Sequence, residues 1–277
     1  MRREAIEMAV LQPGRTVDVY QSGLNGAAAP ATLAVRWAES ESELREAQRL
    51  RYRVFADELG ARLHPPQGSP SGHDIDRFDA HCEHLLVRAV ASDGALGEVV
   101  GTYRLLTPSG ARQAGGWYSD TEFDLRALDV LRPRTVELGR SCVDPAWRKG
   151  GVILLLWTAL CQYMVSRGLD TMIGCASMSM EGDGAMASAI WHQLLDAHHA
   201  DPKWRAAPRL PLRLKPPTAG PAIPVPPLIK GYLRCGTKVL GPPAYDPDFH
   251  TADLPMMARL ADLPPRFRKP PQNAENV

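Results

Sequence analysis

The stretch Glu137–Trp157, ELGRSCVDPAWRKGGVILLLW, decides how this chain is organised. Its first part has the pattern of a β-strand that carries charged side chains, and a turn bounded by Pro145 follows. A basic Gly-Gly loop at 148–151 then leads into an apolar helix. Such a turn points backbone N–H groups and two cationic side chains at whatever lies above the helix N-terminus, commonly a phosphate. The stretch therefore predicts a site for an acyl-thioester or nucleotide phosphate.

Composition restricts the class of protein. The chain has 277 residues, 44% of them hydrophobic, which suits one catalytic domain with a sizeable core. Its 32 basic and 31 acidic residues nearly cancel, so we expect no nucleic-acid partner. Five scattered cysteines without a C-x-x-C pair favour a reducing, cytoplasmic location. The longest apolar run, Val152–Val165, is shorter than the roughly 20 residues that span a bilayer.

The order of the expected elements predicts the fold class. Residues 1–31 and the Pro-rich residues 264–277 read as poorly ordered tails around a single domain at 32–263. Ser40 and Glu43 form a capping-box pattern before a helix. We expect strands at 32–38, 84–90, 98–106, 135–143, 171–176, 228–235 and 249–257, and helices at 40–60, 148–167 and 186–198. This is an α+β (α/β) arrangement, a mixed, mostly antiparallel sheet flanked by helices.

That layout, with its basic Gly loop, resembles the GCN5-related N-acyltransferases. Three further clusters follow in order: Arg51-Tyr52-Arg53-Val54-Phe55, then Asp76-Arg77-Phe78-Asp79, then Gly101-Thr102-Tyr103-Arg104-Leu105-Leu106. The ordered set resembles both the acyl-homoserine lactone synthases and the ornithine lipid N-acyltransferases. These sister groups take an acyl chain from acyl carrier protein.

A longer match favours the L-ornithine Nα-acyltransferase family. It consists of Gly115–Leu125, Gly174–Ser177, Pro227–Arg234 and the series Asp246…Phe249…Thr251…Asp253. The resemblance covers roughly residues 33–257. It implies transfer of a 3-hydroxyacyl group from acyl carrier protein to the α-amine of ornithine, the first step of ornithine lipid synthesis. Its product, lyso-ornithine lipid, is a single-chain amphiphile, so transient contact with the inner membrane is expected.

Three alternatives stay open at the level of the sequence. The acceptor could be glutamine or lysine, with the same mechanism. The chain could be an acyl-homoserine lactone synthase that uses S-adenosylmethionine. It could also be a non-catalytic module that binds acyl groups or a carrier protein.

Glu137 is the best candidate for handling the amine, because acyl transfer needs a deprotonated amine and a carboxylate on a central strand can orient it or relay its proton. The alternative is a structural ion pair with Arg140, which we also place among the catalytic residues. A buried guanidinium at Arg104 or Arg140 would need a carboxylate, and Asp76 and Asp79 are the natural partners.

The resemblance places these charged residues beside the polar head of the substrate. The alternative is a scaffold network that holds the first helix and the following loop. We expect Asp79 to pair with the cationic side chain of the acceptor. The resemblance also implies substrate contacts for Arg51, Phe123, Ser141 and Cys142.

The donor side is predicted from the basic loop. Arg148, Lys149, Gly150 and Gly151 would hold the phosphate of the pantetheine arm. The resemblance implies that backbone N–H groups near Cys142 and Val143 stabilise the oxyanion, because the thioester lies along this strand in the fold. Cys142 is not expected to be a covalent nucleophile, because no His lies near it in the sequence. Ile153 stands where many acetyltransferases have a small residue, which favours the phosphopantetheine of acyl carrier protein over coenzyme A.

No metal and no permanently bound cofactor are expected. The His81-Cys82-Glu83-His84 cluster contains ligand types, but adjacent residues on a strand face opposite ways and cannot converge on one ion.

Overall fold

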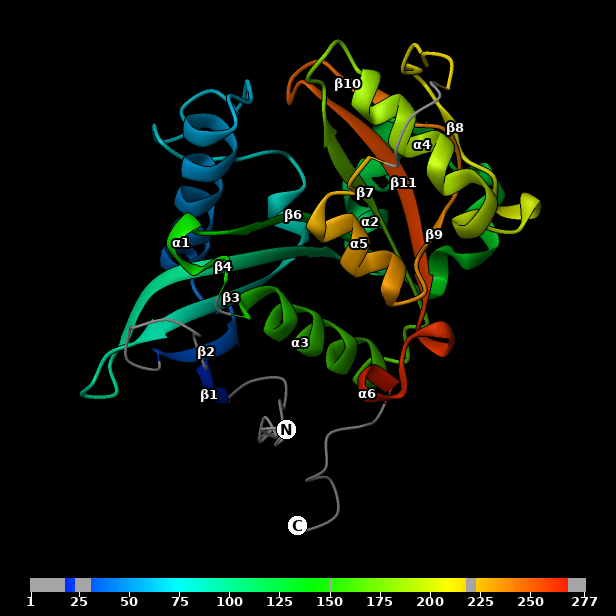
Figure 1. Ribbon diagram of the computed structural model, residues 1–277. Helices are drawn as coiled ribbons and strands as arrows, with labels where there is room; N and C mark the ends of the chain where they lie inside the picture. The colour runs from blue at the N-terminus through cyan, green and yellow to red at the C-terminus, as the bar shows by residue number, and fades with distance from the viewer. Residues whose placement is uncertain (1–17, 23–30, 150, 218–222, 269–277) are drawn as a thin grey trace, which may run out of the picture.

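One mixed sheet organises the part of the chain that the computed structural model describes, residues 18–22, 31–149, 151–217 and 223–268. Its elements are shown in Figure 1. The strands are β1 Asp18–Ser22, β2 Ala31–Trp37, β3 Glu83–Val90, β4 Leu96–Leu106, β5 Phe123–Asp124, β6 Thr135–Val143, β7 Thr171–Ser179, β8 Ala207–Pro208, β9 Lys238–Val239, β10 Ala244–Asp246 and β11 Thr251–Arg259. The helices are α1 Glu41–Tyr52, α2 Pro108–Ala114, α3 Val152–Ser166, α4 Ala185–His198, α5 Pro227–Arg234 and α6 Pro265–Arg268.

The main sheet has the order β1-β2-β3-β4-β6-β7-β11-β10, and β9 pairs with β11. All its pairings are antiparallel except that of β6 with β7, which α3 connects as a crossover. The predicted mixed, mostly antiparallel sheet is therefore confirmed.

The sheet divides between β6 and β7. The two strands pair only from Thr135 with Thr171 to Glu137 with Ile173, although both run on for six residues or so. Beyond Glu137 they diverge, β6 toward α1 and β7 toward β10 (Figure 1). The divergence leaves an opening between the two strands, bordered by their unpaired edges. The candidate site lies in this opening.

A β-bulge on β6 accompanies the divergence. Thr102 of β4 pairs with Cys142, but Arg104 pairs with Gly139, so β6 has one more residue in this interval than β4. Arg140 takes up the irregularity with φ 52°, a left-handed conformation that is uncommon outside glycine. The bulge re-aims the side chains of β6 at the opening.

Helices cover the two faces of the first half of the sheet. Ala47, Leu50 and Val54 of the α1 segment pack on Leu86 and Val99. The neighbouring strand residues, such as Leu85 and Val100, face the opposite way and pack against Leu156 and Leu160 of α3. The capping-box prediction for α1 is confirmed in part, since the Ser40 hydroxyl accepts a hydrogen bond from the Glu43 amide at 3.3 Å.

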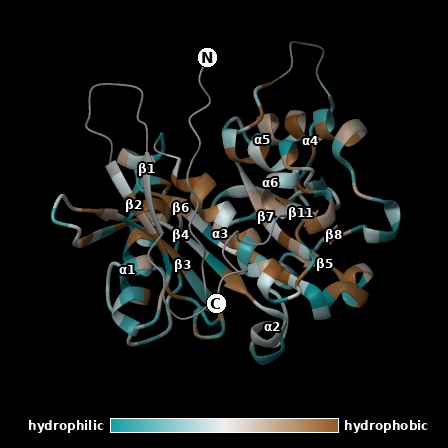
Figure 2. Cartoon of the chain, turned by 90° about the horizontal axis from the view of Figure 1, so that it is seen from below, coloured by the Kyte–Doolittle hydropathy of each residue, from teal (hydrophilic) through white to brown (hydrophobic). Residues whose placement is uncertain are grey.

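The second half of the sheet has its own cover. Ile190 and Trp191 of α4 and Ile229 of α5 pack on Met178 of β7 and Leu254 of β11. Hydrophobic residues concentrate on the strands and on the helix faces turned toward them, and the projecting loops are mostly hydrophilic (Figure 2). The second half therefore has a cluster of its own under α4 and α5, while the cluster under α3 continues across β6 to Met172 of β7 and Ala258 of β11.

Some predicted elements were wrong. Residues 228–235 form helix α5 and not a strand, because Ile229, Tyr232 and Leu233 recur at helical spacing after Pro226-Pro227, which suits a helix start. The helix expected from residue 148 begins at Val152, after a 3-10 turn at Pro145–Trp147.

The expected tails contribute structure at both ends of the domain. Part of 1–31 forms β1, which pairs with β2. Phe267, in the expected C-terminal tail, is buried in α6 against Trp157. The remaining tail residues, 1–17, 23–30 and 269–277, lie outside the described residues. Across the described ranges, no helix combines the length and apolar character needed to cross a bilayer.

Candidate active site

Two adjoining cavities occupy the opening of the sheet. The first, which we term the central cavity, has a volume of about 240 Å³ and a polar wall. Its polar lining comes from Tyr103, Arg104, Tyr118, Ser119, Glu122, Glu137, Arg140, Ser141, Ser177, Asp246 and Asp253. The second, the apolar groove, has a volume of about 530 Å³ and runs between the end of β6, the start of α3 and α5. Both are lined by Phe55, Leu59, Ser141, Leu228 and Tyr232, so they are continuous.

Glu137 lies in the wall of the central cavity at the last β6–β7 pair, and its side chain is 3% exposed. Its carboxylate accepts hydrogen bonds from the backbone amides of Tyr118 (2.5 Å) and Ser119 (2.7 Å) and from the Ser119 hydroxyl (2.5 Å). Burial raises the pKa of Glu137, although these hydrogen bonds act in the opposite direction. Glu137 thus anchors the 3-10 turn Tyr118–Thr121, and one of its oxygens retains capacity for a further donor.

The alternative of a Glu137–Arg140 ion pair is wrong. Arg140 pairs with Asp74 at 3.2 Å and with Asp76 at 3.3 Å. Its guanidinium also lies over the rings of Tyr118 at 5.0 Å and Phe249 at 4.7 Å. The positive φ of the bulge turns this side chain into the central cavity, where it forms part of the wall.

Three guanidinium groups and three carboxylates form a buried network beside the cavity. Arg104 donates to Asp76 (2.7 Å) and Asp79 (2.9 Å), as expected for these partners. Arg51 donates to Asp74 (2.8 Å) and bidentately to Asp79 (3.0 and 2.7 Å). The network joins α1, the loop before β3, β4 and β6, and its opposite charges balance.

This geometry corrects the roles expected for several of these residues. Arg51 and Asp79 are 0% and 4% exposed, are paired with each other and line neither cavity. Asp76 also lies outside the linings of these two cavities. The carboxylates therefore serve the scaffold, and only Arg104 and Arg140 of the network reach the cavity wall.

Phe123 also differs from the expectation. It is 0% exposed, packs with Phe78, Leu125 and Leu128, and lines neither of the two cavities. Its place is in the core under the 118–121 turn.

The apolar groove contains the predicted donor residues. Ser141, Cys142 and Val143 line it along β6, and Arg148 and Ile153 line it at the start of α3. Burial raises the pKa of Cys142 to about 12, so the thiol stays protonated, as expected for a residue that is not a nucleophile.

Arg148 is half-exposed at the groove and forms a bidentate ion pair with Glu58, with both N–O distances 2.6 Å. Lys149 is exposed beside it. Gly151 is the N-cap of α3 with φ 77°, a conformation that favours glycine. Gly150 lies outside the described residues. A phosphate at this helix N-terminus would meet Arg148 already paired, so binding requires Arg148 to exchange partners or to contact both.

The hydroxyl groups of two tyrosines form a hydrogen-bonded pair in the wall of the central cavity, next to the groove. The Tyr103 and Tyr232 hydroxyls are 2.9 Å apart, and Tyr232 lines both cavities. Burial raises the pKa of Tyr103 to about 12 and that of Tyr232 well above its usual value. Both therefore stay protonated and can donate a proton or a hydrogen bond.

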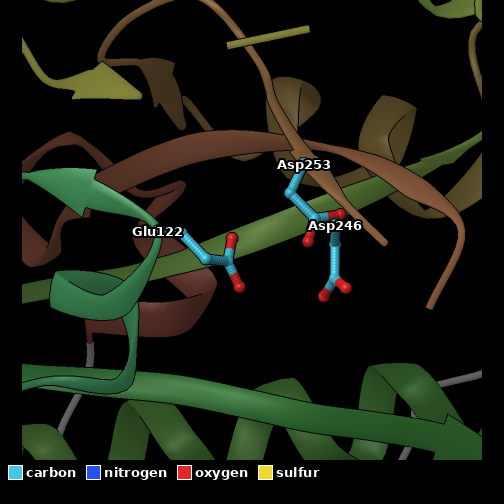
Figure 3. Close-up of side chains that lie close together, drawn as sticks. All are labelled: Glu122, Asp246 and Asp253. Carbon is cyan, nitrogen blue, oxygen red and sulfur yellow. The ribbon is translucent and has the colours of Figure 1, made fainter. Parts of the chain in front are cut away.

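Three acidic residues line the central cavity for which the sequence predicted no role. Ligand oxygens of Glu122, Asp246 and Asp253 all lie within 4.8 Å of one another. Figure 3 shows the Glu122 side chain directed toward the other two. Glu122 is far from the other two in the sequence, and the signal for all three was their place in the motifs that carry the family resemblance, Gly115–Leu125 and the series Asp246…Asp253.

The electrostatics of these three groups are unusual. Burial, reinforced by Asp253 and Asp246, raises the pKa of Glu122 to about 8. Burial, reinforced by Asp246, raises the pKa of Asp253 to about 6. The wall thus gathers three carboxyl groups whose ionisation is disfavoured by burial and by one another, and the basic residues of the same cavity, Arg104 and Arg140, pair with other carboxylates.

Comparison with known proteins identifies relatives over most of the chain. Residues 50–158 match the family model described as an acetyltransferase (GNAT) domain. The chain is 36% identical over 250 residues to the L-ornithine N(alpha)-acyltransferase of Rhizobium meliloti (strain 1021), covering 86% of this chain and 83% of the relative. It is 37% identical over 254 residues to the protein of the same name from Brucella abortus (strain 2308), covering 85% and 87%.

Solved structures also align with this chain. One is the crystal structure of the AHL synthase LasI, with 16% identity, a TM-score of 0.47, and coverage of 83% of this chain and 90% of that chain. Another is FeeM, an N-acyl amino acid synthase from uncultured soil microbes, with 10% identity, a TM-score of 0.44, and coverage of 82% and 91%.

Proposed function

The chain belongs to the L-ornithine N(alpha)-acyltransferase family, and on that premise we propose that it transfers a 3-hydroxyacyl group from acyl carrier protein to the α-amine of ornithine. The continuity of the two cavities is the observation that supports this most directly. An apolar groove suits an acyl chain, and a polar cavity with carboxylates suits an amino acid. The thioester would lie where they meet, beside Ser141.

The donor residues have a place in this scheme. The pantetheine phosphate would lie at the N-terminus of α3 near Arg148, Lys149 and the glycines 150–151. Backbone N–H groups of β6 near Cys142 and Val143 would stabilise the oxyanion, because β7 has already diverged from β6 at this level. No bound cofactor is needed, since the acyl-phosphopantetheine is itself a substrate.

The chemistry balances as a direct transfer. The deprotonated α-amine attacks the thioester carbon and forms a C–N bond, the C–S bond then breaks, and the thiolate receives a proton. Glu137 would take the proton of the amine directly or through water, and the Tyr103–Tyr232 pair would relay that proton to the thiolate, so that Glu137 and both tyrosines return to their starting states.

The mouth of the groove also suggests where the product goes. Leu59, Leu154 and Leu228 line the groove and are 63%, 42% and 40% exposed. We expect this apolar rim to touch a bilayer transiently, so that the single-chain product can leave without crossing water. Replacement by Ser of Leu154, which does not line the junction of the two cavities, should lower sedimentation with anionic vesicles and leave a water-soluble short-chain product released at the wild-type rate.

The proposal is tested with purified protein, 3-hydroxyacyl carrier protein and ornithine, with mass spectrometry of the products. We expect N-acylornithine and free carrier thiol in equal amounts, and slower formation with the coenzyme A thioester. Glutamine, lysine and S-adenosylmethionine are tested in parallel as acceptors. Thioester hydrolysis without any amide product, or preferential acylation of S-adenosylmethionine, would overturn the proposed function.

A further inference from the structure

The geometry points to Glu122, Asp246 and Asp253 as the subsite that binds the side-chain ammonium of the acceptor amino acid, and so as the selector for a diamino acid. We term these three residues the acidic triad. This inference rests on the proposed function and names the part of the central cavity that decides which amino acid is acylated.

The triad faces the interior of the cavity from rigid positions. Asp253 is on β11, opposite Ser177 of β7, and is 4% exposed. Asp246 ends β10, and its Oδ1 accepts the amides of Asp248 and Phe249, which fixes the side chain. Glu122 follows the 3-10 turn that Glu137 anchors.

Among the described residues, no cationic side chain forms an ion pair with the triad. Both carboxylate oxygens of Glu122 are buried and accept no hydrogen bond from a described residue. The Cys175 thiol and the Tyr118 hydroxyl lie close enough to offset part of the rise in its pKa, but they do not reach hydrogen-bonding geometry. A buried acceptor without a donor is costly, so a ligand that brings donors gains the most here.

An alkylammonium fits this wall better than other ligands. It carries three N–H donors, one for each carboxylate, and a positive charge that the triad lacks. The aromatic rings of Tyr118 and Phe249 in the same wall suit the aliphatic chain of the acceptor.

The position of the triad also orients the substrate. None of the three is among the residues shared by the two cavities, whereas Ser141 and Tyr232 are. An acceptor held by its side-chain ammonium therefore keeps that group away from the thioester and presents its α-amine toward it. The distance between the two ends then selects the length of the side chain.

The test compares ornithine with norvaline, which has the same carbon chain without the terminal ammonium. We expect wild type to prefer ornithine by at least about 100-fold in kcat/KM. Glu122→Gln and Asp253→Asn should each lower kcat/KM for ornithine by about 10- to 100-fold and leave norvaline unchanged or improved, the scale of a hydrogen bond to a charged group. Asp248→Asn, on the same hairpin but outside the cavity lining, is the matched control and should change neither.

A change of length gives a sharper result. Glu122→Asp keeps the charge but withdraws it by one methylene, so it should raise the lysine-to-ornithine ratio of kcat/KM by about 10-fold. Melting temperatures of all variants confirm that they fold.

The outcomes separate this inference from the proposed function. If wild type acylates no α-amino acid, norvaline included, the proposed function itself fails. If it acylates ornithine and norvaline equally, or if the triad variants lose both activities alike, only the inference is overturned. It is also overturned if EDTA abolishes activity and Mg²⁺ or Ca²⁺ restores it through the triad, because the cation would then be a metal.

Discussion

Glu137 combines two duties at the level of a single residue. Its carboxylate holds the backbone of Tyr118 and Ser119, and it lies in the wall of the central cavity. A glutamine cannot accept hydrogen bonds at both ends of its amide, so a variant disturbs the turn as well as the chemistry. To separate the structural role from the chemical one, a second variant is needed at a residue that donates a hydrogen bond to Glu137.

For Glu137→Gln we expect turnover to fall by about 10²- to 10⁴-fold, the usual scale for a general acid or base, with little change in carrier affinity. Ser119→Ala removes the 2.5 Å hydroxyl hydrogen bond to Glu137 and a 3.4 Å one with the Cys175 thiol, so it should cost stability with a small loss of turnover. Single-turnover rates and melting temperatures are measured for both. If the two variants lose activity in proportion to their loss of stability, Glu137 serves the turn alone.

The loop before β3 is the element that the ion network fixes. Burial alone would raise the pKa of Asp79. The guanidinium groups of Arg51 and Arg104 nevertheless hold this pKa below its usual range. The Gln48 amide also donates to this carboxylate at 3.0 Å. The position of the loop against α1 therefore depends on buried charge pairing.

Asp79→Asn should lower the free energy of unfolding by about 3–5 kcal/mol, because it leaves buried guanidinium groups without a full partner. It should lower kcat/KM for ornithine and norvaline by the same factor, since the carboxylate does not face the acceptor. Urea unfolding and the two rates are the measurements. If kcat/KM falls for ornithine and not for norvaline, Asp79 contacts the acceptor after all.

Helix α5 presents the charges expected to meet the carrier protein. Lys230 and Arg234 are exposed one turn apart on α5, and Arg234 lines the apolar groove. Arg148 lies at the same groove. Acyl carrier proteins are acidic, so this face complements them.

Reversing both charges of α5, with Lys230→Glu and Arg234→Glu, should lower kcat/KM for the acyl carrier protein by about 10-fold and flatten its dependence on salt. The rate with a free acyl-pantetheine should not change, which separates docking from chemistry. Lys203→Glu, exposed on a turn outside the groove lining, is the control. A wild-type rate that does not respond to salt would argue against electrostatic docking.

The acidic triad affects the stability of the whole molecule. Burial and the neighbouring carboxylates of Asp253 and Asp246 raise the pKa of Glu122 to about 8 from its ordinary value of 4.5, and Cys175 and Tyr118 lie beside it. The stability that the protonated form contributes is fully present below pH 4.5 and is lost as the pH rises through about 8.

Glu122→Gln should therefore flatten the fall in unfolding free energy between pH 4.5 and 8.5 and stabilise the protein at pH 8.5 by about 1–3 kcal/mol. Denaturant unfolding across this range measures it, with Asp248→Asn as the control that keeps the wild-type slope. If the unfolding free energy of Glu122→Gln falls with pH as steeply as that of wild type, Glu122 ionises at its ordinary pKa in the folded protein.

Local sequence signals determined the elements that depend on local physics. Alternation and capping predicted β6 at its observed bounds and the start of α1 near Ser40, because these depend on backbone hydrogen bonds and on burial of one face. The need to pair a buried charge predicted that Arg104 would form ion pairs with Asp76 and Asp79. The same local reasoning failed for α5, where a short apolar run fits strand and helix alike.

The sequence by itself determined the strands and helices from β2 to α4 that depend on local patterns, the carboxylate partners of Arg104, and the family. Only the tertiary structure decided which charges face the substrate. The β-bulge turns Arg140 into the central cavity, and the network withdraws Arg51 and Asp79 from it. The pairing of β10 and β7 with β11 brings Asp246 and Asp253 together, and the turn that Glu137 anchors brings Glu122 to them. Side-chain direction follows from strand register and divergence, and these depend on contacts between residues far apart in the chain.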